Sequence, residues 1–575
     1  MAERTFGWVQ EAYVLGNLKR VVQLFLYDSP VNKMLREDKI PRLVPESYGR
    51  DEFIRELSEE DMAIPYTHLK GKGIPKGFTR SSSPCTGIVQ AALPGQRKEY
   101  QGDWPADSFL RWAVSVGFLD YDRDKDTCAL SEAGKRYAAS ADKSPEEEEI
   151  LTEAFLSYPP VCRIVNLLVY KGHMTKFELG GMLGFIGEAG FTSIPQSQIL
   201  QGLKEADSQK ERSRLLADTE GTSDKYVRTI CGWLKQLGWV EQEERQVTAG
   251  KGSGIYTDTI PQAYRITLKG RKAAKGIKGT SRYAKIPKRV LWDMLATKAG
   301  DRDYLRNRRT YLIQALVSDY RTLPWLAAML EKKGIPETES VILDEIRGFE
   351  NIGLSVSRLR DTYKITDKIQ GLAIPSQLRT GHLRKSDRSV VKDEVRKRLE
   401  HVDHKYLILI DLGFDSDSNR DYEIQTAELL TTELELKGAR LGDTRKPDVC
   451  VYYGKKGLIL DNKAYSKGYP LPMSQADEMV RYIEENKARQ KGINPNEWWK
   501  IFDENVDEFH FAFVSGEFVG GFQDRLNNIS HRTGVSGGAV NSVNLLLLAE
   551  ELKSGRMDYD QWFEYFSQNA EVGIL

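Results

Sequence analysis

Three segments of the chain share one pattern: an amphipathic helix, a glycine, a hydrophobic strand, a loop and a returning strand. A glycine directly after a helix is typical of a C-terminal cap. A helix followed by a two-stranded hairpin forms the end of a winged helix, a variant of the helix-turn-helix. The pattern therefore predicts three winged-helix units. In the first copy the helix and its first strand span residues 109–119 and the returning strand spans 128–131. The corresponding ranges are 226–240 and 264–267 in the second copy, and 346–354 and 363–366 in the third.

The middle copy has the features of a helix that reads DNA, although winged helices also bind proteins. Its helix starts within the run 222–224, whose Thr, Ser and Asp favour a helix N-terminus. Lys225 and Arg228 follow in the first turns, where a recognition helix meets base edges and can address guanine O6 and N7. The basic stretch 269–289 suits phosphate contacts, but a solvated linker has the same composition. The third copy lacks a basic stretch of this kind, so we expect it to pack against protein.

A chain of 575 residues is too long for one core, and about three to five domains are expected. Its formal net charge is zero, yet residues 391–575 hold 23 Lys and Arg against 32 Asp and Glu. Because the whole chain is neutral, residues 1–390 have an equal excess of Lys and Arg over Asp and Glu. This excess favours polyanion binding by the front part of the chain, although moderate differences of this kind are common between domains. Residues 367–390 contain glycine, proline and several polar residues, which indicates a linker between the two parts.

The sequence predicts a cytoplasmic protein with no membrane contact. No segment approaches the length of a membrane span, and the first residues lack an apolar signal region. The five cysteines are odd in number and widely scattered, with neither a CxxC pair nor the spacing of a zinc site. We therefore expect reduced thiols.

A predicted hairpin near the C-terminus carries two carboxylates and a lysine. Residues 449–453 and 457–461 have the composition of strands, and a glycine-containing turn joins them. A hairpin of this length brings Asp448 beside Asp461. Asp461 and Lys463 project from the same face because they lie two residues apart on a strand.

This arrangement suits a metal-dependent phosphodiesterase. Two converging carboxylates favour a hard cation such as Mg²⁺, and the backbone carbonyl of Asn462 is a plausible further ligand. The ion would neutralise charge on a phosphate and lower the pKa of a bound water, which Lys463 could orient. Pro-Asp followed by Asp-x-Lys is the signature of a large class of DNA-cutting enzymes. The alternative is an ordinary solvated salt-bridge cluster, which the pattern alone does not exclude.

Longer runs around this hairpin and through the front part resemble the FokI-like type IIS restriction endonucleases, in the same order over nearly the whole chain. The resemblance implies a multidomain α+β fold. It would combine an N-terminal DNA-recognition module of winged-helix subdomains with a C-terminal α/β PD-(D/E)xK nuclease domain that has a mixed central sheet. The similar runs are 4–10, 50–56, 74–85, 223–226, 286–290, 445–448, 461–466, 471–472, 475–479, 494–499 and 513–516.

The resemblance implies an enzyme that binds a short asymmetric double-stranded DNA site, GGATG or a relative, and cuts both strands at a fixed distance outside it. The implied cofactor is Mg²⁺, with Mn²⁺ able to substitute, and the products carry 5′-phosphates. A cognate DNA methyltransferase in a bacterial restriction system is implied as well. The expected units are winged-helix subdomains at 1–148, 149–283 and 284–368, a linker at 369–390 and the nuclease domain at 391–575.

The resemblance also assigns roles to single residues. Asp448, Asp461 and Lys463 would be catalytic, and the Thr of the family is replaced here by Asn462, whose side chain we expect to point away from the metal. Glu11 and Ala217 each stand at a position where the family has Asn. The exact DNA sequence that the protein recognises is therefore not determined by the resemblance. The positions expected to contact DNA are Gln10, Glu11, Arg80, Trp104, Glu220, Lys225 and Arg228.

One active site per chain cuts one strand at a time, so a double-strand break requires a second copy. Asp477 and Arg481 are four residues apart on one helix face. Across a twofold interface, Asp477 of each chain could pair with Arg481 of the other chain, as the resemblance implies. An intrahelical pair between them is the alternative. If no dimer forms, a site-specific nickase results; if the nuclease fold is inactive, the chain is a winged-helix DNA-binding regulator.

Overall fold

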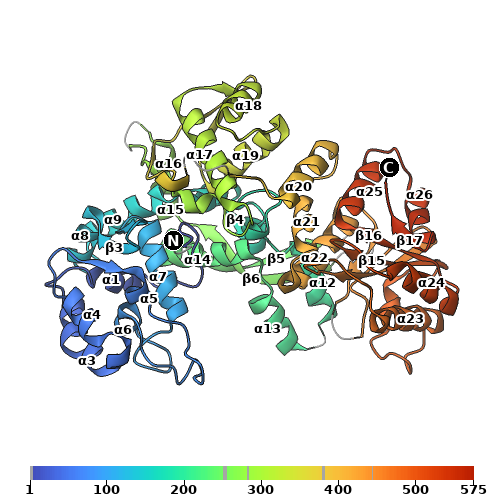
Figure 1. Ribbon diagram of the computed structural model, residues 1–575, viewed down its shortest axis with the longest axis horizontal. Coiled ribbons are helices and arrows are strands. Elements are labelled where there is room, and N and C mark those ends of the chain that lie inside the picture. Colours follow the sequence, from blue (N-terminus) through green and yellow to red (C-terminus); the bar gives the residue numbers. More distant parts are fainter. Residues whose placement is uncertain are drawn as a thin grey trace.

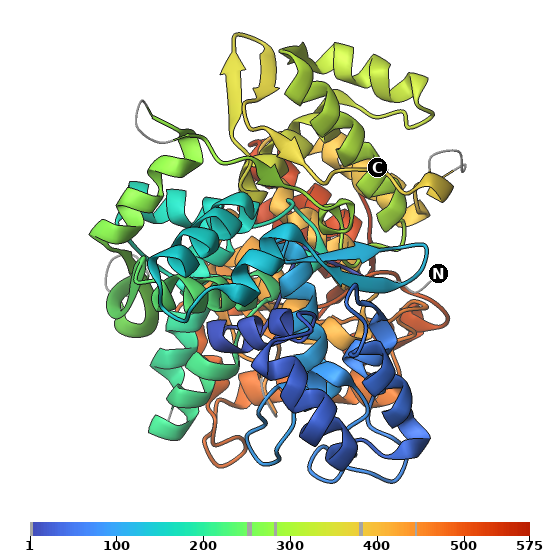
Figure 2. The ribbon, with the colours of Figure 1, turned by 90° about the vertical axis from the view of Figure 1, so that its left-hand side faces the viewer.

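The computed structural model describes residues 4–206, 208–249, 256–280, 284–378, 383–442 and 445–574. The molecule is elongated, with three helical units that carry small sheets and, at the other end, a domain built on one large sheet (Figure 1). Seen from the end of the first unit, that unit lies in front and the large-sheet domain lies behind it (Figure 2). The predicted multidomain α+β class is confirmed.

The first unit is a winged helix with several added helices. The hairpin of β2 (Leu119–Asp122) and β3 (Thr127–Leu130) follows α7 (Asp103–Ser115), and β1 (Ala63–Pro65) pairs with β3 to give the strand order β1-β3-β2. The apolar face of α7 is buried in the unit's core. The other helices are α1 (Leu15–Gln23), α2 (Pro30–Met34), α3 (Ile40–Leu43), α4 (Arg50–Glu56), α5 (Tyr66–Lys70), α6 (Ile88–Ala92), α8 (Glu132–Ala139) and α9 (Pro145–Ser157).

The second unit repeats this plan around α14 (Thr222–Gln236). Its hairpin is β5 (Val240–Ala249) and β6 (Tyr256–Ile266), and β4 (His173–Thr175) completes the order β4-β6-β5. Trp233 of α14 stacks on Trp112 of the first unit, with ring centroids 4.2 Å apart, so the two units share one apolar core. The other helices are α10 (Pro159–Lys171), α11 (Lys176–Gly180), α12 (Gln196–Glu205), α13 (Gln209–Asp218), α15 (Leu268–Ala273) and α16 (Lys275–Lys278).

The third unit has the same helix-and-hairpin ending, and its apolar side chains belong to the same core as those of the first two units. Phe349 of this unit lies edge-to-face against Phe185 of the second unit. The strands of the third unit have the order β8-β10-β9. Asp344, on its last helix, accepts a hydrogen bond from Arg396 of the large-sheet domain at 2.9 Å. The third unit therefore packs against other parts of the protein, namely the second unit and the C-terminal domain. Its elements are α17 (Arg302–Ser318), β8 (Arg321–Thr322), α18 (Leu323–Lys332), α19 (Glu339–Ile352), β9 (Val356–Leu359) and β10 (Thr362–Ile365).

The C-terminal domain has a six-stranded sheet in the order β12-β13-β14-β15-β16-β17. The first two pairings are antiparallel and the other three parallel, which confirms the predicted mixed sheet. Separate apolar cores cover its two faces. The strands are β12 (Lys437–Arg440), β13 (Val449–Tyr453), β14 (Lys456–Lys463), β15 (Glu508–Ser515), β16 (Gly537–Asn541) and β17 (Ala570–Val572).

Helices from different parts of the domain form the two layers. On one face lie α20 (Asp387–Arg398), α21 (Ile408–Leu412), α22 (Asn419–Glu428), α25 (Ser542–Lys553) and α26 (Tyr559–Glu564). On the other face lie α23 (Met473–Ala488) and α24 (Phe522–Thr533). The hairpin formed by β13 and β14 is thus held between two helical layers.

The segment expected to be a linker contains a short strand. β11 (Ile369–Gln370) pairs with β7 (Lys288–Arg289). α20 (Asp387–Arg398) begins inside the expected linker, because the Ser386 side chain accepts a hydrogen bond from the Ser389 amide and caps the helix. Residues 379–382 of the expected linker, and Arg282 of the basic stretch, lie outside the described residues.

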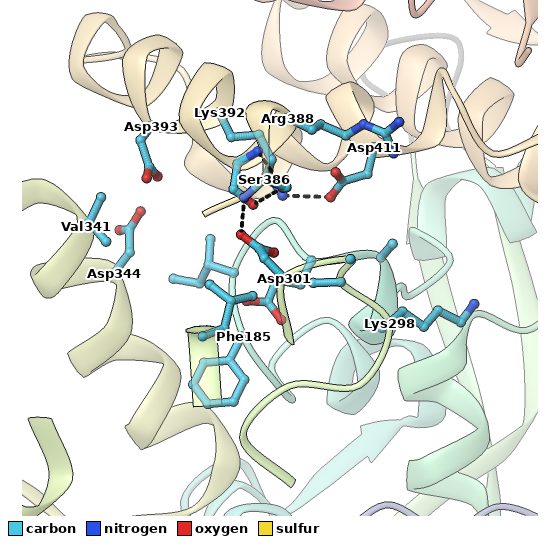
Figure 3. Close-up of a pocket in the computed structure, with 18 of the residues that line it drawn as sticks. Phe185, Lys298, Asp301, Val341, Asp344, Ser386, Arg388, Lys392, Asp393 and Asp411 are labelled. Carbon is cyan, nitrogen blue, oxygen red and sulfur yellow. Dashed lines mark hydrogen bonds and ion pairs between the residues drawn. The ribbon is translucent and has the colours of Figure 1, made fainter. Parts of the chain in front are cut away.

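A cavity of about 840 Å³ lies where the second and third units meet the start of the C-terminal domain (Figure 3). Lys392 crosses this junction: its ammonium donates to the carbonyl of Gly187 at 2.7 Å and pairs with Asp411 at 2.8 Å. The Ser386 amide donates to Asp301 at 3.0 Å. A junction with a charged cavity buries less apolar surface than a continuous core, so it is a weaker connection than the cores of the domains it joins.

All five cysteines are buried and free. Among the helices that the structure describes, none combines the length and the apolar composition needed to cross a membrane.

Candidate active site and DNA interface

The structure brings the predicted catalytic residues together at the end of one hairpin. Val449 of β13 pairs with Leu460 of β14, so Asp448 and Asp461 occupy adjoining positions. The Asn462 amide donates to Asp448 Oδ2 at 2.7 Å, and Lys463 Nζ pairs with Asp461 Oδ2 at 2.7 Å. Asp461 is only 3% exposed. The hairpin geometry predicted from the sequence is therefore present.

Negative charge accumulates at this site. Burial, together with the carboxylates of Asp461 and Glu423, raises the pKa of Asp448 well above its usual range. Burial opposes the charged form of Lys463, but the carboxylates of Asp461 and Asp448 outweigh it and raise the pKa of that lysine. The nearby positive charge does not balance these buried carboxylates. Carboxylate oxygens are the ligands that a hard divalent cation prefers. The residues present therefore fit such an ion.

The Asn462 side chain has a structural contact on the other side of the strand. Its Nδ2 donates to Thr426 Oγ1 of α22 at 2.8 Å. Residues alternate between the faces of a strand, so this side chain lies opposite those of Asp461 and Lys463. Only its backbone is available to the side of the strand that carries Asp461 and Lys463.

Two residues of the site were missed by sequence reasoning. Glu423 of α22 forms an ion pair with Arg440 of β12 at 3.0 Å and adds negative charge beside the hairpin. Tyr482 of α23 donates to the carbonyl of Lys446 at 2.8 Å, which fixes the loop before Asp448. Neither residue is part of a local motif.

The expected DNA contacts fall into two groups. Lys225 and Arg228 lie in the first turns of α14, and Arg228 forms an ion pair with Glu220 at 3.0 Å. Glu220 is almost fully buried and also pairs with Lys176 at 2.7 Å. The structure therefore holds this carboxylate between two cations beside the start of the helix.

The second group belongs to the first unit. Gln10 and the exposed Glu11 lie in the N-terminal arm, which runs beside α14. Arg80 lies in the exposed loop between α5 and α6, and Trp104, in the first turn of α7, is 51% exposed. The arm is thus brought to the recognition helix, whereas Arg80 and Trp104 extend the surface over the first unit.

The expected interface residues are accessible and have other partners within the chain. Asp477 and Arg481 both lie on α23. Asp477 accepts from Arg532 of α24 at 2.6 Å, and Arg481 pairs with Glu478 at 3.0 Å and with Glu485 at 3.7 Å. These contacts are the ones that a twofold interface would have to rearrange.

Four protein-family models match successive parts of the chain. They are FokI recognition domain subdomain 1 at residues 4–140, recognition domain subdomain 2 at 147–281, the FokI D3 domain at 295–361 and the FokI cleavage domain at 385–573. The type II restriction enzyme FokI of Planomicrobium okeanokoites is 39% identical over 99% of each chain. The chain belongs to the FokI family of type II restriction endonucleases.

Other members of the family agree. The type II restriction enzyme StsI of Streptococcus sanguinis is 31% identical over 94% of this chain and 91% of its own. A solved structure of FokI matches with a TM-score of 0.92 and 37% identity over 100% of both chains. A structure of FokI bound to DNA matches with a TM-score of 0.93 and 38% identity, over 99% of this chain and 100% of that one. The FokI-family chain is accordingly a site-specific DNA endonuclease.

Proposed function

We propose that this FokI-family protein is a type IIS enzyme: it binds a short asymmetric double-stranded DNA site, GGATG or a relative, and hydrolyses both strands at a fixed distance outside it. The observation that carries the proposal is the convergence of Asp448, Asp461 and Lys463 in a buried acidic site on a domain separate from the winged helices. Separate reading and cutting units explain why cleavage would fall outside the site. The proposed setting is a bacterial cytoplasm, with a cognate methyltransferase protecting the host DNA.

The chain's own residues account for the chemistry. Asp448 and Asp461, with the Asn462 carbonyl, would hold Mg²⁺, for which Mn²⁺ could substitute. When bound, this ion supplies positive charge for the pentavalent phosphate and lowers the pKa of a water. Lys463 orients the attacking water and stabilises the developing hydroxide. In-line displacement then leaves a 5′-phosphate and a 3′-hydroxyl.

DNA recognition is proposed for the face formed by the arm and α14. Lys225 and Arg228 lie where a recognition helix meets base edges. Arg228 would donate to guanine, and its ion pair with Glu220 fixes the guanidinium before DNA arrives. Gln10, Glu11, Arg80 and Trp104 would add contacts from the first unit.

The nuclease domain rests on the second unit close to its active site. Ile424 of α22 is 1% exposed and packs in an apolar cluster with side chains of the second unit, among them Ile194 and Leu200. Gln425 Nε2 donates to the Ser193 carbonyl at 3.2 Å, and Arg420 donates to Thr219 at 2.8 Å. We infer that this contact, together with the hydrogen bonds of Lys392 and Arg396 across the junction, keeps the nuclease docked until DNA is bound.

Replacing Ile424 with alanine is expected to loosen the docking. The change removes apolar contact with the second unit at a cost of about 2–3 kcal/mol, while the domain's own core stays intact. The ratio of off-site to on-site nicks should rise about fivefold or more, measured by sequencing the ends of a digested plasmid. Ile424→Val is the matched control and should stay near wild type. An unchanged ratio in the alanine variant would remove the docking role.

The experiment that tests the proposed function is digestion of a sequenced plasmid with Mg²⁺, followed by sequencing of every fragment end. Breaks at constant offsets from one asymmetric motif would support the type IIS function and give the motif and the offsets together. Nicks in one strand only would indicate a site-specific nickase. Sequence-specific binding without any cleavage would indicate a regulator.

A further inference from the structure

The arm of the first unit is bound along one face of α14 by three side chains. The Thr229 hydroxyl accepts from the Glu11 amide at 3.0 Å. The Trp233 indole donates to the Ala12 carbonyl at 2.7 Å, and Gln236 Oε1 accepts from the Leu15 amide at 3.1 Å. The three α14 positions are four and three residues apart, so they form one stripe. The arm and the recognition helix are therefore held as one body.

Glu11 has an unusual backbone within this body. Its φ is +64°, the left-handed region that non-glycine residues rarely adopt. The Ala12 amide donates to the Gln10 carbonyl at 2.9 Å, which closes a three-residue γ-turn around Glu11. A strained turn of this kind persists only where surrounding contacts fix it. The Glu11 amide has such a contact in Thr229.

The Thr229 hydroxyl also joins this turn to the recognition helix. It donates to the Lys225 carbonyl at 2.9 Å while it accepts from the Glu11 amide. Thr229 is 1% exposed, so both hydrogen bonds are shielded from solvent. A threonine hydroxyl often bonds the carbonyl four residues earlier in a helix. Local helix geometry does not explain the other hydrogen bond, because Glu11 lies 218 positions away from Thr229 in the sequence.

We propose that Thr229 is a positioning residue for base recognition by Glu11. The proposal rests on the proposed DNA-binding function. The single hydroxyl fixes the strained turn relative to Lys225, so that the Glu11 carboxylate reaches one base edge in the groove that α14 enters. A carboxylate accepts hydrogen bonds and donates none, so the base it selects carries an exocyclic amino group, cytosine above all. Thr229 thereby sets specificity without touching DNA.

The test compares Thr229→Val, which keeps the shape and loses the hydroxyl, with Thr229→Ser, which keeps the hydroxyl. Once the site is known, kcat/KM is measured on oligonucleotides that carry each single base-pair substitution. Glu11→Gln identifies the pair read by residue 11. In Thr229→Val, the ratio of kcat/KM between the cognate and the substituted base pair is expected to fall about tenfold at that same pair. The ratio at the pair read by Arg228 should stay unchanged. Thr229→Ser should discriminate as wild type does.

Several results would overturn the proposal. One is a Thr229→Val variant that discriminates like wild type, or that loses discrimination equally at all pairs, as a general structural defect would produce. Another is a Glu11→Gln variant that leaves every base preference unchanged. In each case site-specific cleavage by the wild type would still stand, so the proposed function would survive. Failure of the wild-type enzyme to bind or cut any specific site would instead end both, and thermal melting of the variants would separate misfolding from lost positioning.

Discussion

Asp461→Asn is expected to lower the rate of DNA cleavage by about a thousandfold or more, while affinity for the recognition site stays within about twofold of wild type. The substitution keeps the shape of the side chain but removes half of the carboxylate pair that would hold the metal. Lys463 also loses its 2.7 Å ion pair, so it no longer has a fixed position beside the attacking water. The winged-helix units that would bind DNA lie outside this domain and are unchanged.

Single-turnover cleavage and a gel-shift titration with Ca²⁺ would measure the two quantities. Unfolding is not the expected cause of the loss, because the substitution removes a negative charge beside Asp448, whose pKa the neighbouring carboxylates already raise. The melting temperature should therefore be unchanged or higher, and its increase on adding Mg²⁺ should shrink. Asp507→Asn, at an exposed position of the same domain, is the control. Retained cleavage in Asp461→Asn would refute the assigned catalytic role.

Local pattern was enough to predict much of this molecule. The three helix-and-hairpin repeats depend on spacing and glycine caps, which short sequence windows contain. Asp448, Asp461 and Lys463 could be placed because strand alternation and one turn fix their relation. The start of α20 could not be placed in this way, because its capping residue, Ser386, stands inside a polar run that resembled a linker.

Contacts between distant segments could not be read from the sequence. Glu423 reaches the active site only because α22 packs beside the hairpin, and nothing in its own neighbourhood marks it. The bond between Thr229 and Glu11 depends on how two separate units dock. Asp477 pairs with Arg532 because α23 and α24 lie side by side, whereas helix spacing alone suggested Arg481. Such pairings follow from tertiary packing, which overrides local rules.

The second large effect concerns the dimer that double-strand cleavage requires. Asp477→Arg and Arg481→Asp, each used alone, are expected to reduce double-strand breaks by about 10- to 100-fold while leaving binding to DNA unchanged. In a twofold interface each variant would place like charges opposite one another. In the Asp477→Arg variant the new arginine would also face Arg532, the present partner of Asp477. Nicking should fall less than double-strand cleavage, because one site cuts one strand.

Mixing the two variants decides whether the loss comes from the interface. A chain with two arginines at these positions complements a chain with two aspartates, so the mixture should recover at least about half of wild-type double-strand cleavage. Neither variant alone should recover at higher concentration to the same extent. Arg481→Lys keeps the charge and serves as the control. The rate should also rise faster than linearly with enzyme concentration. If the mixture stays as inactive as its components, the charges act within one chain, and the interface must lie on another face of the nuclease domain.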